Sequence, residues 1–507
     1  MKTNKIFKQL LLIGIAFFIS NACTDDFQEL NTDPAIMTAD QVDVGLLLTR
    51  VQKEMTIGNS IAEGGLPGQY SGYTATSGSY PFMGGDEPTY FNRAYKNLLN
   101  LAEIIRLTQD EPAQVNKTAI ARIMRAYIFQ YVTDIYGDVP YTEAVKSGEN
   151  VITQPKYDTQ ESIYKDLLKE LKEAAAQLED DNTVGYGEAD LIYKGDTDKW
   201  RRFANSLRLR LALRARYVDE ALAQQHIGEV LSADLMENNS HSAFVMTSTD
   251  FEANQNPIYN ALFANRYYGG YMGRPIVDNL KDNDDPRLTL LVNPTVNSKL
   301  DADTTGDLSL LEYRGRALGL EQDEIELYPG NELSEIGPLY RPAVVQAPVM
   351  YYSEVCFALA EAKLFLGLGE TSADVWYENG IRADMENDGI EEESITAFLD
   401  NPAISLAGTN EEKLEQIINQ KHIALFPNSF EAWAEWRRTG YPKILIGSMK
   451  GDTDGQIPRR LRYPFAEANF NSQNYQEVSN RIGGDKLLSK MWWDTNPDVP
   501  YEHLGEL

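Results

Sequence analysis

AIARIMRAYIFQYVTDIY, residues 119–136, is the stretch that decides the fold class of this chain. From Ile120 to Tyr127 and beyond, its apolar residues recur at i, i+3 and i+4 spacing, which places them on one face of an α-helix. We expect Asn116 to cap this helix at its N-terminus and Gly137 to end it. A helix with such a wide apolar face must pack against other helices.

The same periodicity recurs on both sides of this stretch. Further helices are expected at about residues 98–105, 160–178, 197–217, 219–231, 351–366, 372–386, 411–425 and 429–436. Long segments rich in Gly, Pro, Asn and Tyr lie between them, chiefly residues 58–92, 238–273 and 282–347. Loops of this length in a compact domain are usually functional. The pattern predicts a mainly α fold of paired helices, with a loop-rich part inserted at about 238–347. Tetratricopeptide-like pairing suits the Ala and Tyr content, although no clean 34-residue repeat can be found.

The N-terminus is typical of a bacterial lipoprotein signal. Three lysines precede the apolar run Leu10–Ile19, and small Ala22 stands directly before Cys23. We expect residues 1–22 to be removed, Cys23 to carry the lipid, and residues 23–42 to form a tether. The alternative is an ordinary secretory signal that leaves Cys23 as a free thiol. Residues 43–507 are then the folded domain.

The net charge and the number of cysteines disfavour several classes of function. The chain holds 76 acidic and 46 basic residues, a formal net charge of −30. A surface this negative repels phosphate backbones and anionic lipids, so nucleic-acid binding and electrostatic adhesion to membranes are disfavoured. Once Cys23 carries lipid, only Cys356 remains, which excludes an intramolecular disulfide. Cys356 is expected to be a small buried residue and no nucleophile.

Four ordered blocks in the C-terminal half carry a family resemblance. They are MYYSEV at 350–355 with AEA at 360–362 and Gly367, YENGIR at 377–382, QKHIAL at 420–425 with EAWAEWRRTG at 431–440, and IPRRLRYP at 457–464, followed by Asn474-Tyr475 and Trp492-Trp493. Together with DPRL at 285–288 and the lipoprotein start, they make the whole chain resemble the SusD/RagB family of nutrient-binding outer-membrane lipoproteins.

This resemblance implies a specific fold and role. The fold would be a right-handed superhelix of four tetratricopeptide-like helix pairs that supports a variable, loop-rich ligand-binding face. Family members are lipid-anchored at the outer membrane, facing the cell surface. They act as the lid of a SusC-like TonB-dependent transporter. They capture oligosaccharides, or peptides in some branches, and do not cleave them.

Candidate ligand-binding residues are aromatic side chains on glycine-rich backbone, because glycine lets rings lie open and lets the backbone approach a ligand. Two segments fit: one contains Tyr70, Tyr73, Tyr80 and Phe82, and the other contains Asn265, Arg266, Tyr267, Tyr268 and Tyr271. The alternative is that these rings are half-buried anchors of the loops. The six tryptophans lie in helical or signature segments and are expected to be structural.

Six arginines crowd the predicted helix 197–217: Arg201, Arg202, Arg208, Arg210, Arg214 and Arg216. An anion site is one interpretation. Their positions point in different directions around the helix, however, so we expect surface arginines that pair with acidic neighbouring helices.

Signatures of enzymes and metal sites are thin. The chain has four histidines, no two of them at i, i+3 or i, i+4 spacing, and neither a G-x-S-x-G elbow nor a P-loop. Asp452 to Gly455 resembles half a calcium loop, but the expected glutamate is replaced by Tyr463, so we expect a turn. We expect no cofactor; a structural calcium near Asp282 to Asp285 has no further support. Three hypotheses remain: a glycan-binding lipoprotein, a peptide-binding one of the same architecture, and, least favoured, a lipid-anchored glycan hydrolase.

Overall fold

The computed structural model describes residues 42–60, 65–76, 81–146, 152–179, 184–264, 270–497 and 499. The chain divides into two compact units, Met1–Val44 and Gly45–Leu507. Nearly all of the first unit, including Cys23, lies outside the described residues. The fold below is that of the second unit.

Helices dominate the described residues, as predicted. They are α3 (Val44–Ser60), α4 (Leu66–Tyr70), α5 (Pro88–Thr108), α6 (Val115–Tyr136), α7 (Gln160–Gln177), α8 (Thr197–Arg214), α9 (Glu220–Val230), α10 (Pro257–Tyr259), α11 (Arg274–Asp282), α12 (Leu288–Leu291), α13 (Val296–Thr305), α14 (Gln322–Ile325), α15 (Tyr352–Leu366), α16 (Ala373–Asn387), α17 (Glu392–Leu399), α18 (Asn410–Leu425), α19 (Ser429–Thr439), α20 (Phe465–Phe470) and α21 (Ser472–Arg481). Strands are short: β1 (Thr74–Thr76), β2 (Val139–Pro140), β3 (Tyr157–Asp158), β4 (Ala243–Met246), β5 (Gly270–Met272) and β6 (Gln346–Met350). They form three antiparallel pairs, β1–β5, β2–β3 and β4–β6.

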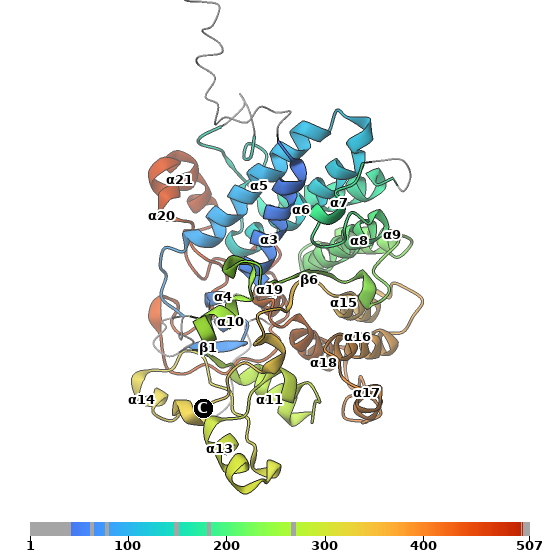
Figure 1. The fold of residues 1–507 in the computed structure, drawn as a ribbon. Coiled ribbons are helices and arrows are strands. Elements are labelled where there is room, and N and C mark those ends of the chain that lie inside the picture. The colour runs from blue at the N-terminus through green and yellow to red at the C-terminus, as the bar shows by residue number, and fades with distance from the viewer. Residues whose placement is uncertain are drawn as a thin grey trace, which may run out of the picture. The chain divides into compact units, whose positions relative to one another are not determined.

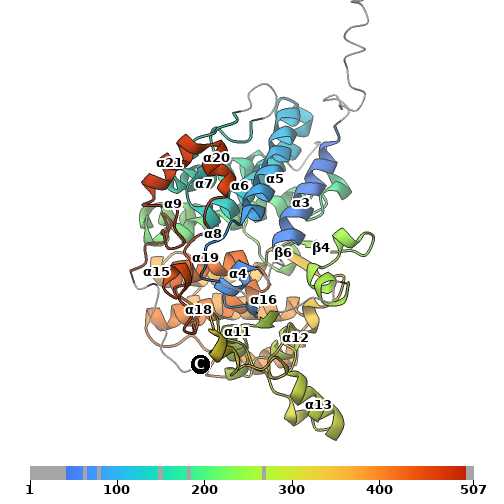
Figure 2. The ribbon, with the colours of Figure 1, turned by 90° about the vertical axis from the view of Figure 1, so that its left-hand side faces the viewer.

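The scaffold consists of four helix pairs: α5 with α6, α7 with α8, α15 with α16, and α18 with α19. Each helix packs on the next in this series up to α8, and α15 packs on α8 as well as on α16 and α18. Figures 1 and 2 show this succession from α5 to α18. The predicted scaffold of paired helices is therefore confirmed.

Helix α6 illustrates where local signals succeed and fail. Eighteen of its residues are buried, and it ends at Gly137, whose φ of 83° is the left-handed region that glycine accepts readily. The predicted N-cap is wrong, because Gln114 occupies that position. Asn116 lies inside the helix, and its side chain exchanges two hydrogen bonds with the backbone of Glu179, at 2.7 and 2.8 Å. The amide serves a long-range contact, which sequence spacing does not reveal.

The loop-rich insertion leaves the scaffold after α9 and returns to it before α15. Its ends meet in the β4–β6 pair, where Met246 lies opposite Gln346. The insertion holds helices that the sequence did not predict, chiefly α11 and α13. Its buried aliphatic residues, among them Ile276 and Leu291, share one hydrophobic cluster with scaffold residues such as Leu425 of α18. In both views α13 extends at the end of the unit opposite to α5 (Figures 1 and 2).

Most of the predicted structural residues are indeed buried. Trp200, Trp433, Trp436 and Trp493 are at most 1% exposed, and Cys356 is fully buried. Burial raises the pKa of the Cys356 thiol to about 12, so it is protonated and unreactive at neutral pH. The other two tryptophans, Trp376 and Trp492, are half-buried.

The arginines of α8 correct the sequence analysis. Arg208, Arg210, Arg214 and Arg216 are paired with carboxylates, as expected, but they are buried and not on the surface. Arg210 binds Glu354 with two bonds of 2.6 Å, and Arg214 Nη1 lies 2.5 Å from Asp134 Oδ2. Arg210 and Arg214 share one helix face because they are four positions apart.

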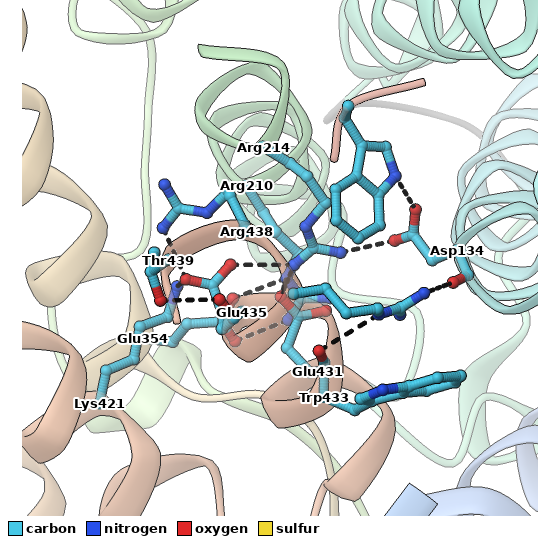
Figure 3. A network of polar contacts seen from close by, with 12 residues as sticks. Asp134, Arg210, Arg214, Glu354, Lys421, Glu431, Trp433, Glu435, Arg438 and Thr439 are labelled. Carbon is cyan, nitrogen blue, oxygen red and sulfur yellow. Dashed lines mark hydrogen bonds and ion pairs between the residues drawn. The ribbon is translucent and has the colours of Figure 1, made fainter. Parts of the chain in front are cut away.

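These contacts belong to a larger buried ionic network, of which Figure 3 shows the part around Arg214 and Glu435. Its cations are Arg210, Arg214, Arg216, Lys421 and Arg438, and its anions are Asp134, Glu354, Glu361, Glu431 and Glu435. The charges balance, and every one of the four helix pairs contributes at least one residue. The network therefore locks the pairs to one another.

Among the described residues, no helix is long and apolar enough to cross a membrane.

Candidate ligand-binding site

The two predicted aromatic segments meet in space. Strand β1 belongs to the first and β5 to the second, and they pair with Thr74 opposite Met272 and Thr76 opposite Gly270. Residues nearly 200 positions apart in sequence are thus brought to one short ribbon, although the sequence analysis did not predict that they meet.

Three of the predicted aromatic residues are part of the core and not open rings. Tyr70, Tyr73 and Phe82 have no exposed surface. Tyr70 packs on Trp433 with ring centroids 5.2 Å apart, and the Tyr73 hydroxyl donates to the carbonyl of His422 at 2.6 Å. Tyr70 thus packs on α19 and Tyr73 on α18, while Phe82 lies against the backbone at Gly319 and Gly451. This burial favours the alternative of structural anchors for these three rings.

Several predicted site residues lie outside the described residues. They are Tyr80, Asn265, Arg266, Tyr267, Tyr268 and the lipidation residue Cys23. Their roles remain predictions.

Tyr271 on β5 is the predicted aromatic that keeps some exposed surface. Its ring faces the guanidinium of Arg316, whose Cζ lies 6.0 Å from the ring centroid. Its hydroxyl lies against the backbone of Gly330, where a Cβ would come within 2.2 Å. Tyr271 also packs on a small apolar cluster that includes Tyr328 and Leu333.

A pocket opens beside this cluster in the loop-rich insertion. We call it the arginine–tyrosine pocket; it has a volume of about 550 Å³, and Arg274, Asp278, Lys281, Tyr313, Arg314, Gly315 and Tyr328 are among its lining residues. Aromatic and apolar surface combined with a few directed polar groups is typical of small-molecule sites.

Backbone hydrogen bonds fix the wall of this pocket. The Met272 N–H donates to Ser334 O at 2.8 Å, and the N–H groups of Arg316 and Arg274 complete the ladder, donating to Met272 O and Arg316 O at 2.9 Å each. The chain at Gly315 approaches so closely that a Cβ there would lie 2.5 Å from Arg274 Cα. Only glycine fits at this position.

The side chains in the pocket are held by one another. Arg274 Nε lies 2.9 Å from Asp278 Oδ2, one turn further along α11. Arg314 stacks over the ring of Tyr328 at 4.8 Å and donates to Leu327 O at 3.0 Å. Tyr313 is half-buried, so one part of its ring is open.

Two pKa shifts describe the electrostatics of the pocket. Partial burial raises the pKa of Tyr313, so its hydroxyl stays neutral. Partial burial opposes the charge of Arg274, but the hydrogen bond and the charge of Asp278 outweigh it and raise the pKa of Arg274. The pocket therefore offers an open ring, neutral hydroxyls and fixed arginine donors, a combination suited to binding a hydroxyl-rich ligand.

A second, larger pocket lies between α3, α5 and the insertion. We call it the lysine pocket; it has a volume of about 820 Å³, and Lys53, Glu54, Arg93, Lys96 and Asn260 are among its lining residues. None of the described residues that line it is aromatic. In sequence it adjoins the predicted residues that begin at Asn265.

The sequence analysis missed Tyr313, Arg314 and Tyr328. A signal was present: YRG at 313–315 and YPG at 328–330 place tyrosine on glycine-containing backbone inside the flagged segment 282–347. The chosen segments had more tyrosines, but density of tyrosine did not predict exposure.

No metal site is found in the described part of the chain, which holds no group of three or more His, Cys, Asp or Glu side chains placed to bind an ion. The expected turn at Asp452 to Gly455 is present, with Asp454 in the left-handed conformation.

Comparisons with known proteins agree on one family. Residues 36–464 match the SusD-like family described as "Starch-binding associating with outer membrane". Among solved structures, a chitin-binding protein is 31% identical with a TM-score of 0.78, over 90% of this chain and all of the other. No protein with a curated function was found to match.

Two further structures are similar. A SusD homolog from Bacteroides uniformis is 26% identical with a TM-score of 0.75, over 90% of this chain and all of the other. A chitin-binding SusD homolog from Flavobacterium johnsoniae is 25% identical with a TM-score of 0.73, over 89% and 98%. These similarities also bear out the predicted superhelix of tetratricopeptide-like helix pairs.

Proposed function

This chain belongs to the SusD-like family, and we propose that it is a glycan-binding protein of the bacterial outer membrane that captures oligosaccharides without cleaving them. The family match over residues 36–464 is the observation that carries this proposal. It is supported by two similar structures that bind chitin.

The arginine–tyrosine pocket is the proposed binding site. Sugar rings bind to aromatic faces through their C–H groups, while arginine and carboxylate side chains hydrogen-bond their hydroxyls. A stacked ring contributes roughly 1 kcal/mol, so one or two rings alone give no tight binding, and hydrogen bonds must supply the rest of the roughly 4 kcal/mol that a millimolar affinity requires. Among the described residues, Tyr313 offers the open part of a ring to the pocket, and Tyr271 packs against the lining residue Tyr328. The predicted residues Asn265 to Tyr268 are proposed to extend the site.

The partner proposed for this protein is a SusC-like TonB-dependent transporter, for which the protein acts as a lid. Weak binding suits this role, because captured glycan must be released to the transporter. The signal-like N-terminus supports attachment by a lipid on Cys23, with the folded domain at the cell surface. A barrel protein should co-purify with this protein from solubilised outer membranes, and a Cys23→Ala variant should lose it. This result would support both the transporter partner and the lipid attachment. If no barrel protein co-purified with the lipidated protein, the lid role would be overturned.

The decisive experiment is a binding panel with the full chain purified in detergent. Retardation in gels that contain chitin derivatives, starch or other polysaccharides should reveal one ligand, and peptide digests serve as the competing class. Turnover of a labelled glycan would contradict the non-catalytic role, and retention of peptides alone would contradict the ligand class.

With that glycan in hand, Tyr313→Ala and Arg314→Ala should each weaken binding about fivefold, because each removes roughly 1 kcal/mol of contact. Both side chains lie at the surface of the pocket, so the melting temperature should hardly change. Lys96→Ala in the lysine pocket is the matched control and should bind normally. If only the Lys96 variant lost affinity, the site would move to the lysine pocket.

A further inference from the structure

One face of α11 lines two pockets and not one. Beyond the arginine–tyrosine pocket lies a smaller hollow of about 390 Å³, which we call the asparagine pocket; it is lined by Asn279, Asn283 and Asn419 with Pro275, Pro442 and Leu445. Arg274 and Asp278 line both pockets. The two hollows are therefore neighbours that share the Arg274–Asp278 ion pair as their common wall.

The ion pair that forms the shared wall is partly exposed to solvent. The side chains of Arg274 and Asp278 are 33% and 38% exposed, and they are joined at 2.9 Å. A chain-like ligand bound in the first pocket can contact both groups and continue past them.

The polar groups of the asparagine pocket are already arranged by the protein. The Asn283 amide donates to Asn279 O at 2.7 Å and to Asn279 Oδ1 at 2.9 Å, and the Asn279 amide donates to Asn419 O at 3.1 Å. These bonds connect α11 to α18 and hold the amides in place before any ligand arrives.

One acceptor in this pocket is left without a partner. Asn419 Oδ1 is buried and has no hydrogen-bond donor in the described part of the chain. Buried polar atoms are normally satisfied, and Asn419 also lines the pocket, so a turn of its amide toward the hollow would let this acceptor meet a donor on a ligand. A hydroxyl or an acetamide N–H of a sugar is such a donor.

The charges of the pocket disfavour an anionic ligand. Lys443, which also lines it, is paired with Glu415 at 2.9 Å, and Arg274 is paired with Asp278. Asp282 is the lining charge with no ion pair among the described residues. Anions would meet neutralised cations, whereas a hydroxyl-rich chain finds amides for its hydroxyls and the prolines for its apolar faces.

We infer that the asparagine pocket is a second subsite for a neutral glycan chain that begins in the arginine–tyrosine pocket and crosses the Arg274–Asp278 pair. This inference rests on the proposed function. It adds that the preferred ligand is an extended oligosaccharide and that Asn419 and Asn283 bind the sugar units that lie beyond the Arg274–Asp278 pair.

The test uses calorimetry on the full chain in detergent, with chito-oligosaccharides and malto-oligosaccharides from the dimer to the octamer as probes. Affinity for the bound series should rise with chain length and then level off. Asn419→Leu should leave short oligomers unaffected and weaken long ones about tenfold, the effect of one lost hydrogen bond at the upper end of its usual range. Asn283→Ala should act in the same direction.

Controls separate this inference from the proposed function and from folding. Asn480→Ala, on the exposed face of α21, should bind long and short oligomers like the wild type. Asn419→Leu removes an amide whose acceptor is unpaired, so its melting temperature should stay close to that of the wild type. If the melting temperature falls, the binding of long and short oligomers to Asn283→Ala tests the second subsite instead.

Three outcomes are decisive. Length-independent affinity, or an equal loss for short and long oligomers in the Asn419 variant, would overturn the second subsite while glycan binding stands. No binding of these oligosaccharides at any length, together with no retardation by any polysaccharide of the binding panel, would overturn the proposed function, and the subsite with it.

Discussion

The buried network around Arg214 in the helical scaffold and the Arg274–Asp278 pair in the loop-rich insertion both join arginine to carboxylates, but burial gives them opposite roles. In the scaffold, Arg214 is 1% exposed and its carboxylate partners are at most 6% exposed. In the insertion, Arg274 and Asp278 are about one third exposed. Charges that are fully committed to one another cannot serve a ligand, whereas half-exposed ones can. Residue type does not decide the role of an ion pair; access to solvent does.

The pKa shifts of the buried carboxylates agree with this view. Burial alone would raise the pKa of Glu435, but the charges of Arg438, Lys421 and Arg214 outweigh it and hold the pKa well below its usual range. A lowered folded-state pKa means that this stabilisation is complete above the ordinary glutamate value and is lost as the pH falls through the folded-state value.

Breaking the scaffold network should have the largest effect. Arg214→Ala leaves Asp134, Glu431 and Glu435 short of a buried cation, which should lower the free energy of unfolding by about 3–5 kcal/mol. Arg106→Ala, which removes an exposed ion pair with Glu103 on α5, is the control and should change stability too little to resolve. Urea titration measures both. Equal effects would show that burial does not separate the two kinds of ion pair.

Breaking the wall of the arginine–tyrosine pocket should have an intermediate effect. Gly315→Ala forces a Cβ against the backbone of Arg274, and overpacking of this kind costs about 1–3 kcal/mol. Ligand affinity should fall as well, because the wall must shift. Gly228→Ala is the opposite case: it lies in α9 with no atom near its added Cβ and should stabilise by about 0.5–1 kcal/mol. Thermal unfolding of both variants checks the signs.

The smallest change in stability is expected at Asp388, a scaffold carboxylate that has too little positive charge around it. Asp388 follows α16; burial and the charge of Asp384 raise its pKa well above the ordinary value, although Arg287 opposes them. A raised folded-state pKa makes ionisation costly, so Asp388→Asn should increase stability at pH 7. The gain should vanish below the ordinary aspartate pKa, where both states are protonated.

Asp110→Asn, at an exposed position after α5, is the matched control and should change stability at pH 7 too little to resolve. A loss of stability in Asp388→Asn at pH 7 would mean that this carboxylate makes a favourable contact.

The comparison also explains what the sequence could predict. Helical periodicity revealed the pairs, because burial of an apolar face is a local and regular signal. The family blocks identified the family, and the structure shows why they are specific: Glu354, Glu361, Glu431, Glu435 and Arg438 lie in these blocks and build the buried network. These sequence blocks therefore identify the scaffold and carry no information about the ligand.

The candidate site was harder to predict for a physical reason. Tyr70 and Tyr73 sit on glycine-containing backbone, yet contacts with Trp433 and His422, more than 340 positions away, bury them. Tyr313 sits in a similar local context and stays half open. Local composition cannot distinguish the two cases, because the covering residues come from the other end of the chain.

These long separations in sequence also affect the order in which contacts form during folding. Arg214 bonds residues more than 200 positions later, and Trp493 donates to Asp134 across 359 positions. Contacts of such high sequence separation require large loops to close and form late and slowly. Arg214 can meet Asp134 as soon as α6 and α8 have formed, but Arg210 lacks its partner until α15 is made, and Arg214 lacks its other two carboxylates until α19 is made.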